Sequence, residues 1–157
     1  MINFGRVEAD IFVGSAPVNR VDIVRLSQLK VTTVVSLQHD EDFVSHRIYW
    51  PDLQRAYDEH QIDVQRFPIF DFDEGDLGDK LPAAVHALRE RLTEGHRVYV
   101  HCNAGVCRAP ATVLAYLCHY RGMTISQGLE YIRRQRPQAN PYQESVLTAL
   151  SHLSEQA

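Results

Sequence analysis

The stretch from residue 98 to residue 112 reads Val98-Tyr99-Val100-His101-Cys102-Asn103-Ala104-Gly105-Val106-Cys107-Arg108-Ala109-Pro110-Ala111-Thr112. It begins with apolar and β-branched residues typical of a buried strand, and from Arg108 onward its spacing is that of an amphipathic helix. A short segment with Cys102 at its start and Gly105 in its middle separates the two. The stretch therefore predicts a strand, a tight loop and a helix that starts where the loop ends.

A loop that leads from a strand into a helix N-terminus can bind an anion, because its backbone N–H groups converge and the helix dipole adds positive potential. The same field favours the thiolate of Cys102, which is the nucleophilic form of cysteine. Arg108 adds a planar, permanently charged guanidinium that can bind two phosphoryl oxygens. We therefore predict phosphate or a similar oxyanion in loop 102–108, with substrate-binding contacts from Asn103, Ala104, Gly105, Val106 and Cys107.

The spacing Cys102-x5-Arg108, preceded by His101, resembles the signature of the cysteine-dependent protein tyrosine and dual-specificity phosphatases. The longer run His-Cys-Asn-Ala-Gly-Val-x-Arg-Ala-Pro-Ala, with Asp71-Phe72-Asp73 upstream, resembles more narrowly the branch of plant starch phosphatases and laforin. The similarity extends from about Phe4 to the last predicted helix. It implies a single α/β catalytic domain, residues 1–157, with a central, mainly parallel sheet flanked by helices.

The order of predicted elements also favours this fold, because strands and helices alternate. We expect two short strands within residues 4–14, a helix over 19–29, and strands over 31–37, 62–67 and 97–101. Residues 38–51 are predicted to be a surface loop and residues 52–60 a short helix. A further helix carries Leu81, Val85 and Leu88 and has Pro82 in its first turn. The last three helices are expected to begin at Arg108, Thr124 and Asn140.

Composition limits the kinds of partner and compartment. The 157 residues suit one domain, and a net charge of −4 gives no general affinity for nucleic acid or for an anionic membrane. Three irregularly spaced cysteines favour a reducing, cytoplasmic setting, and no stretch approaches the roughly 20 apolar residues of a membrane helix. The eight histidines are scattered, so we predict no metal site and no cofactor. We expect a monomer.

Hydrolysis also requires an acid that protonates the leaving oxygen. The acidic segment 71–76 is the best candidate for a loop that supplies it. The family resemblance selects Asp71, which follows a predicted strand and precedes the nucleophile; Asp73 and Asp76 are weaker candidates. In this interpretation Asp71 acts first as acid and then as base. The alternative is that these residues only make a loop soluble.

Two residues of the Cys102 segment, His101 and Cys107, have more than one interpretation. Direct proton transfer between His101 and Cys102 is awkward, because neighbours on a strand point to opposite faces, so we prefer a role for His101 in hydrogen-bonding the loop. Cys107 occupies a position where the family frequently has glycine. It is either a tolerated small side chain, which we prefer, or a partner for a reversible disulfide with Cys102.

The resemblance also bears on the substrate. Phe72 matches an aromatic platform that glucan phosphatases use to stack on sugars, although it could equally pack beneath its loop. Ala109, where many tyrosine phosphatases carry a hydroxyl, is shared with the starch phosphatases. A second platform aromatic is not found among His46, Tyr49 and Trp50. We interpret Arg133, Arg134 and Arg136 as a charged outer helix face rather than a substrate-steering cluster.

The sequence thus predicts a cysteine-dependent phosphomonoester phosphatase with Cys102, Arg108 and Asp71 as catalytic residues. A phosphorylated glucan is the leading substrate, and a phosphoprotein with phosphotyrosine, phosphoserine or phosphothreonine is the alternative. Two other classes stay open: a phosphate-recognition module without turnover, and a sulfur-transfer or redox protein based on Cys102 and Cys107.

Overall fold

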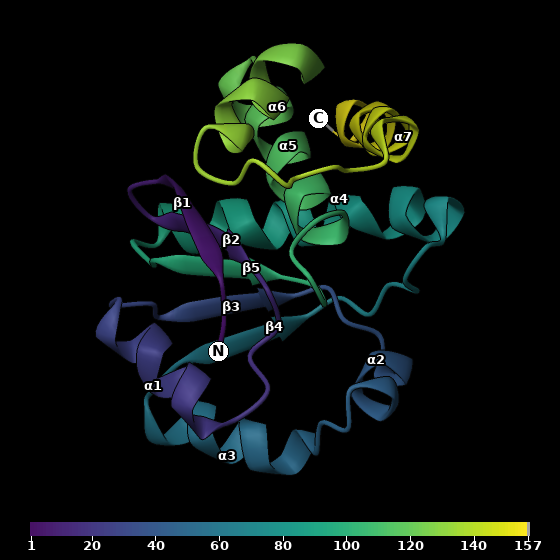
Figure 1. The fold of residues 1–157 in the computed structure, drawn as a ribbon. Helices are drawn as coiled ribbons and strands as arrows, with labels where there is room; N and C mark the ends of the chain where they lie inside the picture. The colour runs from purple at the N-terminus through teal and green to yellow at the C-terminus, as the bar shows by residue number, and fades with distance from the viewer. Residues whose placement is uncertain (157) are drawn as a thin grey trace.

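The computed structural model describes residues 1–156 and contains a five-stranded sheet with helices on both faces (Figure 1). The strands are β1 (Phe4–Glu8), β2 (Ile11–Gly14), β3 (Thr33–Ser36), β4 (Asp63–Arg66) and β5 (Val98–His101). Their order in the sheet is β1-β2-β5-β3-β4, and only the β1–β2 pair is antiparallel. The predicted α/β fold with a mainly parallel sheet is therefore confirmed.

Residues 1–156 also contain seven helices: α1 (Arg20–Gln28), α2 (Asp40–Ser45), α3 (Trp50–Glu59), α4 (Glu74–Thr93), α5 (Arg108–Arg121), α6 (Ile125–Arg133) and α7 (Gln143–Glu155). Figure 1 shows α1 and α3 on one face, and α4 with the later helices on the other. Because successive strand residues point to opposite faces, β5 serves two cores. Tyr99 packs with Phe12 and Val34 toward α1 and α3, whereas Val98 and Val100 pack toward α4 and α5.

The prediction of a surface loop over residues 38–51 is wrong, because this segment contains α2 and the start of α3. His39 caps α2. Its imidazole Nδ1 accepts from the Glu41 N–H, and the backbone N–H of His39 donates to the Asp42 carboxylate. Phe43 is buried and stacks on Trp50, with ring centroids 5.4 Å apart. A histidine cap and one apolar anchor give a weak sequence signal, although they suffice to order the segment.

The predicted position of Pro82 in the first turn of a helix is also wrong, since α4 begins at Glu74 and Pro82 lies inside it. The Asp73 carboxylate accepts from the Asp76 N–H and caps this earlier start. Three residues of the predicted acidic loop, 74–76, are thus helical, and Asp71 stands in the short turn before the cap.

The parallel strands place the site. Gly14, His101, Ser36 and Arg66 are the last residues of β2, β5, β3 and β4, and they lie in register at one edge of the sheet. Loops that follow the carboxyl ends of parallel strands converge there, and ligands of open α/β sheets bind at such an edge. Among the described residues, no helix combines the length and the apolar character needed to cross a membrane.

Candidate active site

The loop between β5 and α5 has the predicted form. Cys102 follows the central strand and is 3% exposed, and Arg108 is the first residue of α5, so the two stand at opposite ends of the loop. Gly105 has a φ of +70°, and a Cβ atom there would lie 2.4 Å from the Gly14 carbonyl carbon. Both the backbone angle and the close approach to β2 therefore require glycine at this position.

Hydrogen bonds from Nη1 hold the Arg108 guanidinium along one of its edges. Its Nη1 donates to the Asp42 carboxylate at 2.7 Å, to the Ile69 carbonyl at 2.8 Å and to the Leu37 carbonyl at 3.3 Å. Its Nε is buried without a hydrogen-bond partner among residues 1–156. The edge formed by Nε and Nη2 can donate two parallel hydrogen bonds to two oxygens of a phosphoryl group.

Asp71 reaches the same edge from the turn before α4. One oxygen, Oδ2, lies 3.4 Å from Arg108 Nη2 and accepts from Asn103 Nδ2 at 3.3 Å. The other two acidic candidates have structural contacts instead: Asp73 caps α4, and Asp76 pairs with Lys80 and accepts from the Phe70 N–H. The three predicted catalytic side chains therefore belong to one neighbourhood, and of the three acidic candidates Asp71, Asp73 and Asp76 it is Asp71 that forms an ion pair with Arg108.

The sequence pattern did not predict that Asp42 belongs to the site. This residue is 7% exposed. Its carboxylate binds Arg108 through one oxygen and accepts from Asn103 Nδ2 at 2.9 Å through the other. Gln38 completes the group by donating to Asn103 Oδ1 at 2.8 Å. Burial opposes the charge of Asp42, but hydrogen bonds from Arg108, Asn103 and the His39 N–H outweigh it and hold its pKa below the usual range. The helix-capping pattern His39-x-x-Asp42, just after a buried strand, is the signal that could have located it.

We expect Asp42→Ala to lower the free energy of unfolding at pH 7 by about 3 kcal/mol, because removing one member of a buried ion pair leaves the other charge poorly compensated. Urea denaturation measures this change. Asp52→Ala, which removes an exposed carboxylate from an exposed ion pair with Arg55, is the matched control and should change stability by less than about 1 kcal/mol. A change at Asp42 as small as that of the control would contradict the buried-pair assignment.

The stabilisation by Asp42 should also depend on pH. A carboxyl group whose pKa is lower in the folded state stabilises the protein above its unfolded pKa of about 3.9, and this contribution disappears as the pH falls through the folded pKa. The stability difference between the wild type and Asp42→Ala should therefore shrink below about pH 4. Repeating the urea titrations at several pH values measures this; a difference that stays constant in acid would contradict it.

The two residues with open interpretations are now placed. His101 is buried, burial lowers its pKa to about 4, and its Nδ1 lies 2.9 Å from the Cys102 carbonyl oxygen. A carbonyl only accepts, so Nδ1 carries the hydrogen, and the preferred hydrogen-bonding role is confirmed. Burial raises the pKa of the Cys107 thiol to about 11, which leaves it protonated and unreactive at neutral pH. This favours the small-side-chain interpretation of Cys107.

Three aromatic side chains line a surface hollow together with Asp71. An open hollow of about 650 Å³ is lined by Phe70, Asp71, Phe72, Asp73, Glu74 and Tyr142. Phe72 is 84% exposed with a φ of +61°, so the interpretation that it packs beneath its loop is wrong. A bulky residue rarely adopts this backbone angle, and such strain occurs at functional sites. Tyr142, at the start of α7, is an aromatic neighbour that the sequence pattern alone did not place there.

The interpretation of Arg136 as part of an outer helix face is also wrong. Arg134 is exposed and pairs with Glu130, as expected, but Arg136 is 2% exposed and contacts the loop after Cys102. The guanidinium of Arg136 turns inward because it donates to the carbonyls of Ala104 and Gly105. The charge pattern of a helix cannot predict such partners. Among residues 1–156, no group of three or more His, Cys, Asp or Glu side chains is arranged to hold a metal ion.

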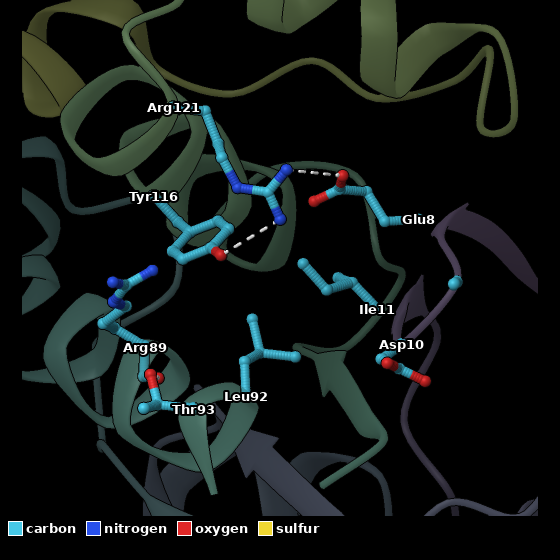
Figure 2. A pocket seen from close by; sticks show the side chains of 9 residues that line it. Glu8, Asp10, Ile11, Arg89, Leu92, Thr93, Tyr116 and Arg121 are labelled. Carbon is cyan, nitrogen blue, oxygen red and sulfur yellow. Dashed lines mark hydrogen bonds and ion pairs between the residues drawn. The ribbon is translucent and has the colours of Figure 1, made fainter. Parts of the chain in front are cut away.

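A second cavity, of about 270 Å³, lies at the opposite end of the sheet, beside the first residue of β2 (Figure 2). Figure 2 shows Arg121 between Glu8 and Tyr116, with which it forms an ion pair of 3.1 Å and a hydrogen bond of 3.4 Å. The carboxyl ends of β2 and β5, and hence Cys102, are at the other edge. This cavity is therefore separate from the candidate active site.

Comparisons with known proteins identify the family of this chain. Residues 11–152 match the family model described as dual specificity phosphatase, catalytic domain. The Castanea sativa protein "Phosphoglucan phosphatase DSP4, amyloplastic" is 33% identical over 140 residues, covering 86% of this chain and 36% of that protein. Laforin of Mus musculus is 30% identical over 147 residues, covering 87% and 44%. The chain spans less than half the length of these relatives.

The fold also resembles solved structures. The crystal structure of Tk-PTP in the active form superimposes with a TM-score of 0.78 at 23% identity, covering 98% of this chain and 97% of that one. At this level of identity the likeness concerns the fold alone.

Proposed function

This chain belongs to the dual specificity phosphatase family, and from that premise we propose that it is a phosphatase that hydrolyses phosphate monoesters through a phosphocysteine at Cys102. The observation that carries the proposal is the approach of Asp71 to the open edge of Arg108, at the mouth of the Cys102 loop. A nucleophile, a phosphate-binding cation and an acid are the groups that this reaction requires.

The reaction proceeds in two steps. The Cys102 thiolate attacks phosphorus while the Arg108 fork and the loop N–H groups stabilise the charge on the equatorial oxygens. Protonated Asp71 gives its proton to the leaving alkoxide, so an alcohol departs and a phosphocysteine remains. The Asp71 carboxylate then takes a proton from water as that water attacks phosphorus, which releases phosphate and restores the thiolate.

The proposed substrate class is a phosphorylated glucan. Phe72 projects into solvent next to the proposed acid and shares the outer hollow with Phe70 and Tyr142. Sugar rings present apolar faces that stack on exposed aromatic rings, so this hollow suits a carbohydrate chain attached to the reacting phosphate. The relative from Castanea sativa that is named phosphoglucan phosphatase supports the same class.

The experiment compares phosphate release from phosphorylated starch or glycogen with release from a panel of phosphotyrosine, phosphoserine and phosphothreonine peptides. Phe72→Ala should lower kcat/KM for the glucan about three- to tenfold, the equivalent of one lost aromatic stacking contact, and leave a small aryl phosphate unaffected. Tyr49→Ala, which removes an exposed aromatic outside this hollow, is the control. Turnover of peptides with an untouched glucan would contradict the substrate class.

A further inference from the structure

The phosphate-binding loop is held from outside through its carbonyl groups. Four consecutive carbonyl oxygens accept hydrogen bonds from segments distant in sequence. In chain order they are Asn103 O from Ala16 N at 2.9 Å, Ala104 O from Arg136 Nη2 at 2.9 Å, Gly105 O from Arg136 Nε at 2.8 Å, and Val106 O from Asn140 N at 2.7 Å. One side chain, Arg136, therefore supplies the two central bonds.

These bonds determine where the loop N–H groups point. In a planar trans peptide unit the C=O and the N–H point in opposite directions, so carbonyls held outward direct the N–H groups of residues 104–107 toward the interior of the loop. Successive N–H groups arranged in this way form an anion-binding nest. The outer hydrogen bonds thus set the geometry that a phosphoryl group meets.

Arg136 is specialised for this contact. It lies between α6 and α7, it is 2% exposed, and among residues 1–156 it has no carboxylate partner. Its Nη2 also donates to Asn3 Oδ1 at 2.7 Å, which links the loop to the start of β1. A Cβ at Gly105 would lie 2.8 Å from the same Nη2, so the guanidinium is seated directly against the loop backbone.

Its charge also bears on the nucleophile. Burial lowers the pKa of the Arg136 guanidinium, and the neighbouring Tyr99 and Cys102 side chains oppose that effect. A guanidinium stays charged even when buried. A second positive charge therefore stands behind the loop, on the side of its outward carbonyls, and like Arg108 it stabilises the Cys102 thiolate and an anion that binds in the loop.

We propose that Arg136 is a positioning residue that holds the Ala104 and Gly105 carbonyls outward, so that the phosphate cradle is formed before the substrate arrives. This inference rests on the proposed function only for its effect on turnover. Its effect on the binding of inorganic phosphate is independent of the identity of the nucleophile.

The test replaces the guanidinium while sparing every group that touches the substrate. Arg136→Gln should weaken binding of inorganic phosphate, measured by calorimetry, and lower kcat/KM for an aryl phosphate, each by about 10- to 100-fold, as for other residues that orient binding groups. KM should rise as well as kcat fall, because an unformed cradle binds the ground state poorly. Arg136→Lys should recover part of the loss, since an ammonium can donate to one carbonyl but lacks the planar fork.

Arg133→Gln is the matched control, because Arg133 is exposed and its Nε donates to the Ala139 carbonyl in the same connecting segment without contacting the loop. It should keep wild-type phosphate affinity and kcat/KM. Thermal denaturation verifies that each variant is folded; if Arg136→Gln is not, Arg136→Lys and Asn3→Ala carry the test. Wild-type phosphate affinity in a folded Arg136 variant, or an equal loss in Arg133→Gln, would overturn the proposal.

Discussion

Cys102→Ser is expected to lower kcat for an aryl phosphate by at least about 10,000-fold, the scale seen when a catalytic nucleophile is removed. The serine hydroxyl stays protonated near neutral pH, and His101 does not activate it, because this neutral imidazole directs its Nδ1–H at the Cys102 carbonyl. The substitution is nearly isosteric, so the fold and the binding of phosphate should persist. The measurement is steady-state hydrolysis of an aryl phosphate together with thermal denaturation.

Cys118→Ser is the control for this prediction. Cys118 is a half-buried thiol in α5, and burial raises its pKa, so it should be an inert packing residue. Its replacement should leave kcat within about twofold of the wild type, as expected of a substitution outside the site. Equal rates for the wild type and Cys102→Ser would rule out thiolate chemistry at this loop.

Arg108→Lys should lower kcat/KM by about 1,000-fold although it preserves the charge. A lysine ammonium cannot contact the Asp42 carboxylate and the Ile69 carbonyl while also presenting two parallel N–H groups to a phosphoryl group. Loss of a donor to transition-state charge typically costs about 100- to 1,000-fold. Steady-state kinetics and inorganic phosphate inhibition should both show the defect.

Arg121→Lys provides the comparison for Arg108→Lys, because Arg121 forms its ion pair with Glu8 at the distant cavity (Figure 2). This variant should retain wild-type kinetics. If Arg108→Lys stayed within tenfold of the wild type, the planar fork would not be the phosphate-binding group, and the assignment of Arg108 would be wrong.

The central part of the fold could be predicted because its signals are local. The β-branched run 31–37 predicts a buried strand, and Asn19 and the Thr124 capping box start the helices that the structure contains. Gly122 ends α5 in the left-handed conformation, as its position predicts. The Cys102 loop could be located because strand, loop and helix are contiguous in the chain.

The parts that could not be predicted depend on contacts between distant segments. Asp42 is ordered by Arg108 and Asn103, both of which come much later in the chain. Arg136 looks like a solvent-facing charge in a helix pattern, and only the loop carbonyls explain its burial. Tyr142 joins Phe72 because α7 packs on α4. In each case the partner is selected by the tertiary fold rather than by neighbouring residues.

The most direct test of the proposed chemistry is to trap the intermediate. Asp71→Asn removes the base that activates water, so phosphocysteine should accumulate when an aryl phosphate with a good leaving group makes the first step easy. After rapid acid quenching and proteolysis, mass spectrometry should find one phosphoryl group on the peptide that contains Cys102. An unmodified Cys102 peptide during active turnover, or a phosphoryl group on another residue, would contradict Cys102 as the nucleophile.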